Sequence, residues 1–211
     1  MLVLLAITLV VIIVLGYYRS KVTQSQDNAE KAFWEKELAA GNTRRQDLEK
    51  LDYITIPLEQ FPLGLNTDAE KELVALSKER IKNFQGLSNT ELKLQYGTAN
   101  LDELSSYESN FIRLQQVVLE YAKELCTADR RADAIHILEF MLQNGGDISG
   151  LYLELATLYQ QEGCEEKVQH LFTTIDQNFA QGPNQSTAKR LKTQLEKYTI
   201  AKENMGEDLT L

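Results

Sequence analysis

Two different hydrophobic patterns divide this chain of 211 residues. The first is an unbroken apolar run, Leu2–Tyr18, which contains no charged side chain. The second begins near residue 67, where apolar residues return every three or four positions, the spacing of an amphipathic helix. The chain is therefore expected to be all-α, with one apolar N-terminal helix followed by a series of amphipathic helices.

The apolar run has the length of a transmembrane anchor, which we expect at residues 1–18. At 1.5 Å per helical residue it spans roughly 25 Å, close to the thickness of a bilayer core. Tyr17 and Tyr18 end the run, and aromatic residues favour the membrane interface. A cleavable signal peptide would need a basic start and a small-residue cleavage site. No Lys or Arg precedes the run, so we favour an uncleaved anchor.

Basic residues lie on only one side of the expected anchor. Arg19, Lys21, Lys31 and Lys36 follow it, whereas the short N-terminal flank carries no basic side chain. Because positively charged flanks remain on the cytoplasmic side, the C-terminal domain is expected to face the cytoplasm. The expected location is thus the cell membrane, with a single pass.

Residues 19–51 are polar and are expected to form a partly helical stalk. Strong helix formers continue to Ala40, and Gly41–Asn42 should end the helix. Phe33 and Trp34 are the bulky side chains of this stretch. They fit packing on the domain, a position at the lipid headgroups, or a dimer contact. No sustained heptad supports a coiled coil.

Residues 52–105 combine an extended arm with short helices. The arm, residues 52–65, holds β-forming residues together with Pro57 and Pro62, which forbid a continuous helix. Three Ser/Thr-x-x-Glu patterns, typical of capping boxes, occur in succession after Leu65. They predict helices that begin at Thr67, Ser88 and Ser105, of which the first ends near Asn83.

The C-terminal half alternates apolar stripes with turn residues. Asn144–Gly146 and Gly163 mark turns, and Asp147 is expected to cap the helix that follows it. Helices are expected at 129–143, 148–161, 165–179 and 186–198, with residues 199–211 as a frayed tail.

Apolar positions in this half repeat at one constant offset, which we call the repeat offset. The pairs are Tyr121 with Leu155, Ala122 with Ala156, Ala134 with Val168, and Leu138 with Phe172. This period of about 34 residues, with small residues where helices approach closely, resembles the tetratricopeptide repeat family. The resemblance implies antiparallel helix pairs over residues 106–198 that end in a capping helix. The first copy has Asp129 in place of the turn glycine, and Pro183 comes later than in the family pattern.

The wider order of segments is similar to that of short bacterial single-pass membrane proteins with tetratricopeptide-like C-terminal halves. In the repeat family, partners bind a concave face built by the first helix of each repeat. Transferred to this chain, the resemblance implies these partner-binding positions: Gln116, Leu119, Lys123, Gly150, Leu153, Thr157 and Gln160. Leucines stand where one branch of the family has polar or charged residues. An apolar, amide-rich groove for a helix or extended segment is therefore expected.

Composition narrows the classes of function. The chain is 43% hydrophobic and 25% charged, a composition from which a soluble domain can bury a core. Its net charge of −9 argues against a nucleic-acid surface, which needs clustered basic residues. The two cysteines, Cys126 and Cys164, do not suggest a disulfide framework.

Candidate chemistry is sparse in this sequence. The two histidines, His136 and His170, are also separated by the repeat offset, so we interpret them as equivalent repeat positions rather than a metal pair. Neither has a carboxylate or cysteine at ligand spacing. The sequence has no glycine-rich phosphate loop, no GxSxG and no HExxH motif. We therefore expect no enzymatic activity, no cofactor, no metal and no small-molecule substrate.

Two functions fit these expectations. The first is a membrane-anchored adaptor or scaffold that binds a protein partner on the concave face. The second is a permanent accessory subunit of a membrane or envelope complex, with the arm at residues 52–65 in its interface. The behaviour of residues 43–211 in solution separates the two, because a stable monomer favours the adaptor and aggregation favours the subunit.

Overall fold

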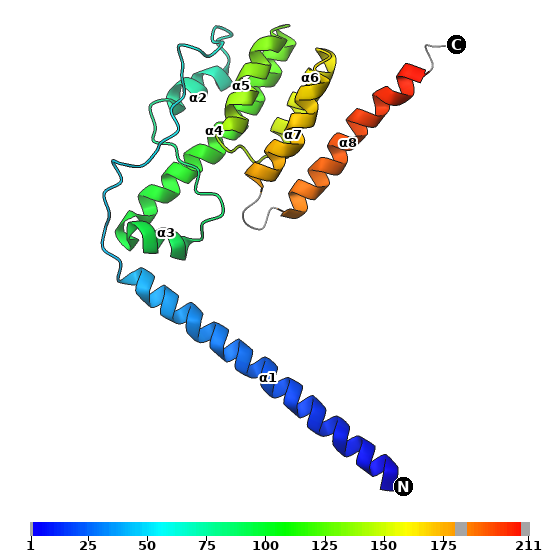
Figure 1. The fold of residues 1–211 in the computed structure, drawn as a ribbon. Coiled ribbons are helices and arrows are strands. Elements are labelled where there is room, and N and C mark those ends of the chain that lie inside the picture. The colour runs from blue at the N-terminus through cyan, green and yellow to red at the C-terminus, as the bar shows by residue number, and fades with distance from the viewer. Residues whose placement is uncertain (1, 180–184, 208–211) are drawn as a thin grey trace. The chain divides into compact units, whose positions relative to one another are not determined.

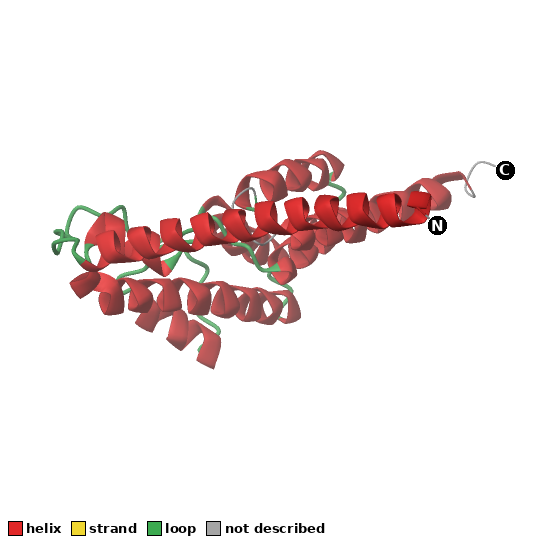
Figure 2. Ribbon diagram, turned by 90° about the horizontal axis from the view of Figure 1, so that it is seen from below, coloured by secondary structure: helices red, strands yellow, loops and turns green. Residues whose placement is uncertain are grey.

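The computed structural model describes residues 2–179 and 185–207, and the side chains of 2–6, 8 and 197–207 lie outside this description. The elements are α1 (Leu2–Gly41), α2 (Asp68–Leu76), α3 (Asn89–Tyr96), the short 3-10 helix η1 (Thr98–Asn100), α4 (Leu101–Thr127), α5 (Arg131–Gln143), α6 (Ser149–Gln161), α7 (Glu165–Asn178) and α8 (Gln185–Glu207) (Figure 1). Helices and loops make up all of the described backbone (Figure 2), which confirms the all-α prediction.

The first helix carries the predicted anchor and much of the predicted stalk. α1 ends at Gly41, where the sequence predicts a break, and its described side chains from Ile7 to Leu15 are exposed apolar groups. Met1 and several side chains of the predicted anchor at residues 1–18 lie outside the described part. Within the part of the chain that is described, no helix is both long and apolar enough to cross a membrane.

The chain forms two compact units. Unit 1 comprises Met1–Leu48 and Ser88–Leu101, with α1, α3 and η1. Unit 2 comprises Glu49–Leu87 and Asp102–Leu211, with α2, the arm, and α4 after its first residue through α8. This division differs from the domains drawn from the sequence. Most of the predicted stalk belongs with α3, and the predicted 52–105 segment is shared between the two units.

In unit 1, the last turns of α1 pack against α3. Ser88 begins α3 with the predicted capping box: its hydroxyl accepts from the Glu91 N–H, and the Glu91 carboxylate accepts from the Ser88 N–H. Glu91 also forms an ion pair with Lys36 of α1 at 3.3 Å. The neighbouring Glu37 accepts a hydrogen bond from the Thr90 hydroxyl. These polar pairs fix the rotation of α1 about its axis relative to α3.

In unit 1, the backbone that follows α3 passes very close to the backbone that follows α1. Gly97 follows α3 with φ of +88°, and a side chain there would place its Cβ 2.5 Å from the Arg44 carbonyl oxygen. Asn100 is fully buried nearby. Its amide donates to the Gln46 carbonyl at 2.8 Å, and its side-chain oxygen accepts from Arg45 Nε at 2.7 Å. These hydrogen bonds hold the residues that follow α1 against the end of α3.

The core of unit 2 is built by the helices together with the arm. Its largest fully buried side chains include Tyr121 of α4 and Tyr152 of α6. The arm at residues 52–65 is a loop with turns rather than a strand. Ile56 and Phe61 of the arm belong to the core and are 5% and 6% exposed. The arm therefore supplies part of the core and is not a free linker.

The helices of unit 2 from α5 to α8 pack on one another. α5 packs on α6, α6 packs on α7, and α8 contacts both α6 and α7 (Figure 1). The connections between α5, α6 and α7 are short, so these three helices alternate in direction.

Two turns in unit 2 share one geometry and are separated by the repeat offset. Asp129, after α4, has φ of +59°, and Gly163, after α6, has φ of +71°. In both turns the N–H of the next residue, Arg130 or Cys164, donates to a carbonyl of the preceding helix at 2.8 Å. Aspartate tolerates the left-handed region better than most residues, so Asp129 can stand where glycine is expected. The backbone of the turn repeats although its side chain does not.

The first helix of unit 2 is shorter than predicted. α2 ends at Leu76 instead of near Asn83. The residues that follow make tertiary hydrogen bonds in place of helical ones, such as the bond from the Ile54 N–H to the Ile81 carbonyl at 2.9 Å. Hydrogen bonds to the arm therefore take the place of the last turns of the predicted helix.

Two further boundaries differ from the prediction. The expected cap at Ser105 is wrong, because η1 leads directly into α4 at Leu101 and Ser105 lies inside the helix. α8 continues to Glu207, through most of the predicted frayed tail at 199–211. The last residues of that tail, 208–211, lie outside the described part.

Candidate functional site

The binding residues predicted from the sequence lie on α4 and α6. On each helix they follow one another at spacings of three or four residues, which places them on one side of that helix. Ile112, 49% exposed, extends the α4 row toward its N-terminus. We call this surface the α4–α6 face; its members are Ile112, Gln116, Leu119, Lys123, Gly150, Leu153, Thr157 and Gln160.

The two rows meet where Leu119 of α4 contacts Gly150 of α6. A Cβ on Gly150 would lie 2.5 Å from Leu119 Cδ2, so the glycine permits a close approach. Leu119 and Leu153 are half-buried and pack against the core, whereas Gln116 and Lys123 are exposed. Leu119 therefore holds the two helices together and offers only part of its surface to a partner.

Gln115 fixes the start of α6 from the neighbouring helix. Its side chain is 1% exposed, and its oxygen accepts from the Asp147 N–H at 2.7 Å and the Ile148 N–H at 3.3 Å. Its amide donates to the Asp147 carboxylate at 3.0 Å. The prediction that Asp147 caps α6 is wrong, because Ile148 is the N-cap residue and has no capping side chain. Gln115 satisfies N–H groups at this end and so sets the position of α6 on α4.

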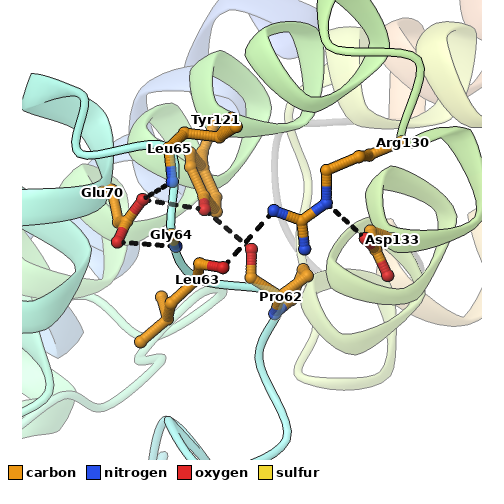
Figure 3. A network of polar contacts seen from close by, with 8 residues as sticks. All are labelled: Pro62, Leu63, Gly64, Leu65, Glu70, Tyr121, Arg130 and Asp133. Carbon is orange, nitrogen blue, oxygen red and sulfur yellow. Dashed lines mark hydrogen bonds and ion pairs between the residues drawn. The ribbon is translucent and has the colours of Figure 1, made fainter.

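A second network ties the arm to the helices (Figure 3). The Glu70 carboxylate of α2, 9% exposed, accepts from the N–H groups of Gly64, Leu65 and Asn66 at 2.9, 2.6 and 2.9 Å. The Tyr121 hydroxyl lies 3.1 Å from the same carboxylate. Three successive backbone N–H groups thus converge on one side chain, which fixes a bend at the end of the arm.

The carbonyl groups of the bend are held by α4 and by the turn after it. The Tyr121 hydroxyl lies 2.8 Å from the Pro62 carbonyl oxygen, and Arg130 Nη1 donates to the Leu63 carbonyl at 3.3 Å. Asp133 accepts from Arg130 Nε at 2.7 Å and orients the guanidinium (Figure 3). The first of the two repeated turns therefore also positions a side chain that binds the arm.

Burial and hydrogen bonding shift the pKa of the Glu70 carboxyl in opposite directions. Burial raises the pKa of Glu70, but the backbone N–H groups and the Tyr121 hydroxyl outweigh it, so the pKa lies below its ordinary value. Burial, then the hydrogen bond to the Glu70 carboxylate, raises the pKa of Tyr121. At neutral pH the pair is a carboxylate beside a neutral phenol, and this charge state holds the arm.

The two histidines have different surroundings on α5 and α7. The His136 ring lies edge-on to Phe61 with 6.2 Å between ring centroids. His170 Nδ1 lies 3.3 Å from the Thr174 hydroxyl of its own helix. Both histidines are exposed. Across the described ranges, no group of three or more His, Cys, Asp or Glu side chains is placed to hold a metal ion.

The two cysteines are both free and half-buried. Burial, followed by the nearby Glu154 carboxylate, raises the pKa of the Cys126 thiol. A raised pKa lowers the fraction of thiolate, which is the nucleophilic form. The surroundings of Cys126 therefore do not favour covalent catalysis.

Comparisons of the chain with protein-family models, with curated proteins and with solved structures found no match. Among the described residues, the candidate site consists of the partly exposed α4–α6 face and of two polar networks that fix the elements around it.

Sequence reasoning does not find the two residues at the centre of these networks. Gln115 interrupts an otherwise apolar stripe between Leu114 and Val117, and a polar side chain on a core-facing stripe is a usable signal. Glu70 is expected only as the partner of Thr67 in a capping box. Gly64 and Asn66 shortly before it indicate a bend, but no local pattern shows that the carboxylate turns toward that bend.

Proposed function

We propose that this protein is a membrane-anchored adaptor that binds a segment of a protein partner on the α4–α6 face. The observation that carries the proposal is the recurrence of one turn geometry at Asp129 and Gly163, each between two consecutive helices and separated by the repeat offset. Stacked helix pairs of this length build repeat proteins whose extended faces bind other proteins. The tetratricopeptide-like identity of the two pairs is part of this proposal.

The membrane anchor is the second part of the proposal. Leu2–Tyr18 holds no charged residue and belongs to a single helix of 40 residues. Arg19 and Lys21 directly after it favour a cytoplasmic position for the rest of the chain. A tether raises the local concentration of the face, so that a small surface with modest affinity can still hold its partner at the membrane.

The α4–α6 face can be tested without disturbing the contact between Leu119 and Gly150. Ile112→Glu combined with Gln116→Glu adds two charges at exposed positions of α4. Recovery of the partner after crosslinking in cells should fall by about tenfold or more, because apolar centres dominate binding energy. The matched control is Gln169→Glu with His170→Glu, which adds the same charges at exposed positions of α7.

Circular dichroism should show unchanged helicity in both variants. Equal recovery of the partner by the two double variants would reject the α4–α6 face as the binding surface. Zinc that copurifies with the wild type and is lost in His136→Ala with His170→Ala would replace the adaptor with a metal-dependent function.

The orientation of the anchor is tested by a fusion after Leu211. Alkaline phosphatase folds only outside the cytoplasm, so its fusion should be inactive, whereas a fluorescent-protein fusion at the same position should fluoresce. The physical reason is that Arg19 and Lys21 hold their side of the helix in the cytoplasm. An active phosphatase fusion would overturn the proposed topology.

The alternative is a permanent accessory subunit with the arm as part of its interface. Ile56 and Phe61 of the arm are buried within unit 2, so these two side chains are not open to a partner. The solution test of residues 43–211 also needs a new boundary. Cutting there would remove the end of α1 from unit 1, so the soluble chain should begin at Ser20.

A further inference from the structure

One side of α1 in unit 1 combines exposed apolar groups with unbalanced charge. Trp34 and Leu38 are 57% and 67% exposed, and a spacing of four residues places them on one side of the helix. Lys36 and Glu37 contact α3 and are not among the residues that line this side. We call the free side the α1 acidic face; the residues that line its shallow hollow are Asp27, Glu30, Lys31, Trp34, Glu35 and Leu38.

The indole of Trp34 is held in place on this face. Its Nε1 donates to Glu30 Oε1 at 3.4 Å, one helical turn earlier. The ring of Phe33 meets it edge to face, with 5.5 Å between the centroids. The polar edge of the indole is therefore occupied by its own helix, and its apolar surface remains open. Tryptophan is one of the residue types enriched among the side chains that dominate the binding energy of protein interfaces.

The charges on this side of α1 indicate which kind of partner can bind it. Asp27, Glu30 and Glu35 are carboxylates, and Lys31 is the one cation among the residues that line the hollow. A second copy of the chain would bring the same excess of carboxylates against this one. An anionic lipid surface would be repelled for the same reason. A cationic partner gains favourable charge pairs, and its Lys or Arg side chains can also stack on the indole.

We infer that the α1 acidic face binds a basic amphipathic helix of another protein. Apolar side chains of the partner, spaced by three or four residues, contact Trp34 and Leu38 in the hollow. Lys and Arg side chains beside them pair with Glu30 and Glu35. The packing of α1 on α3 presents these groups on a fixed surface, which lowers the entropy lost on binding. This inference uses none of the residues of the α4–α6 face.

The binding chemistry is tested with the full-length chain in a non-ionic detergent. The probe is a fluorescein-labelled, 18-residue helical peptide of leucine and lysine, and its partner control is the same pattern with glutamate for lysine. Since Trp34 is the single tryptophan of the chain, its emission reports contact directly. The lysine peptide should shift this emission to shorter wavelength and protect it from acrylamide, and the glutamate peptide should do neither.

Matched variants separate this face from the general acidity of the protein. Trp34→Ala with Leu38→Ala, and separately Glu30→Gln with Glu35→Gln, should each weaken binding of the lysine peptide by about tenfold or more. Asp102→Asn with Glu120→Gln removes the same number of charges at exposed positions of α4 and should change binding by less than about twofold. Equal weakening by the two charge variants, or no weakening by either pair on α1, would overturn the inference.

The occupant in cells is identified by a photoreactive residue at position 38, with position 32 as the control. Ala32 is exposed and lies on another side of α1. The inference requires crosslinks from position 38, absent from position 32, to a segment rich in Lys or Arg with apolar residues at helical spacing. Crosslinks to a second copy of this chain, to lipid, or to an acidic segment would each overturn it.

Discussion

Gly97→Ala should unfold unit 1 while unit 2 stays folded, at a cost to unit 1 of about 3 kcal/mol. The added Cβ would lie 2.5 Å from the Arg44 carbonyl oxygen, and φ of +88° is itself unfavourable for alanine. The clash is with backbone, which cannot rotate aside as a side chain would. Hydrogen exchange followed by mass spectrometry should be faster at residues 44–48 and 88–100 and unchanged in α5–α7.

Gly41→Ala is the matched control for this substitution. Gly41 ends α1, and no heavy atom lies within 4 Å of a Cβ built there. Alanine should therefore be neutral or stabilise the helix by up to about 1 kcal/mol. Wild-type exchange rates in Gly97→Ala would contradict the close contact at Gly97. Equally faster exchange in both units would contradict the expectation that unit 1 unfolds while unit 2 stays folded.

Glu70→Gln should lower the free energy of unfolding of unit 2 by about 3 kcal/mol. A carboxamide has one acceptor oxygen, so its NH₂ group would face an N–H group of the bend at Gly64 or Leu65. Chemical denaturation followed by circular dichroism measures the loss. The matched control is Glu72→Gln on the same helix, because its pair with the exposed Arg113 should contribute less than about 1 kcal/mol. A loss no larger than that of the control would refute the role of Glu70.

The same carboxylate gives the stability of unit 2 a pH dependence of known sign. The pKa of Glu70 is lowered in the folded chain, because its backbone and Tyr121 hydrogen bonds outweigh the opposing effect of burial. Its contribution to stability is therefore complete above the ordinary pKa of glutamate and is lost as the pH falls through the lowered pKa. Wild-type stability should decline over this acid range more steeply than that of Glu70→Gln.

Features encoded by neighbouring residues could be predicted from the sequence. The break at Gly41, the capping box of Ser88 with Glu91, and the turn at Gly163 each depend on residues within a few positions of one another. Periodic apolar positions likewise predict helices, because they report only which side of a segment is buried. The all-α class follows from such local patterns.

Features that join distant parts of the chain could not be predicted in this way. Gln115 reaches the start of α6 across a separation of 32 residues, and Tyr121 reaches Glu70 across 51. Asp147 has the local pattern of a helix cap, yet its carboxylate faces Gln115 because the buried amide offers a better-placed partner. The candidate site is affected in the same way, since the sequence places Leu119 on a face but does not show that it rests on Gly150.

Unit 1 is built from two separate stretches of sequence, so it cannot fold until the second stretch has been synthesised. Lys36 and Glu37 pair with side chains 55 and 53 positions later in the chain. At about 5–20 residues per second, a ribosome needs roughly 3 to 10 s to add that length. Throughout this interval the end of α1 has emerged without α3 to pack on, and all of residues 49–87 must be translated before unit 1 can close. During this interval the nascent chain therefore exposes the end of α1 without the helix on which it packs in the folded protein.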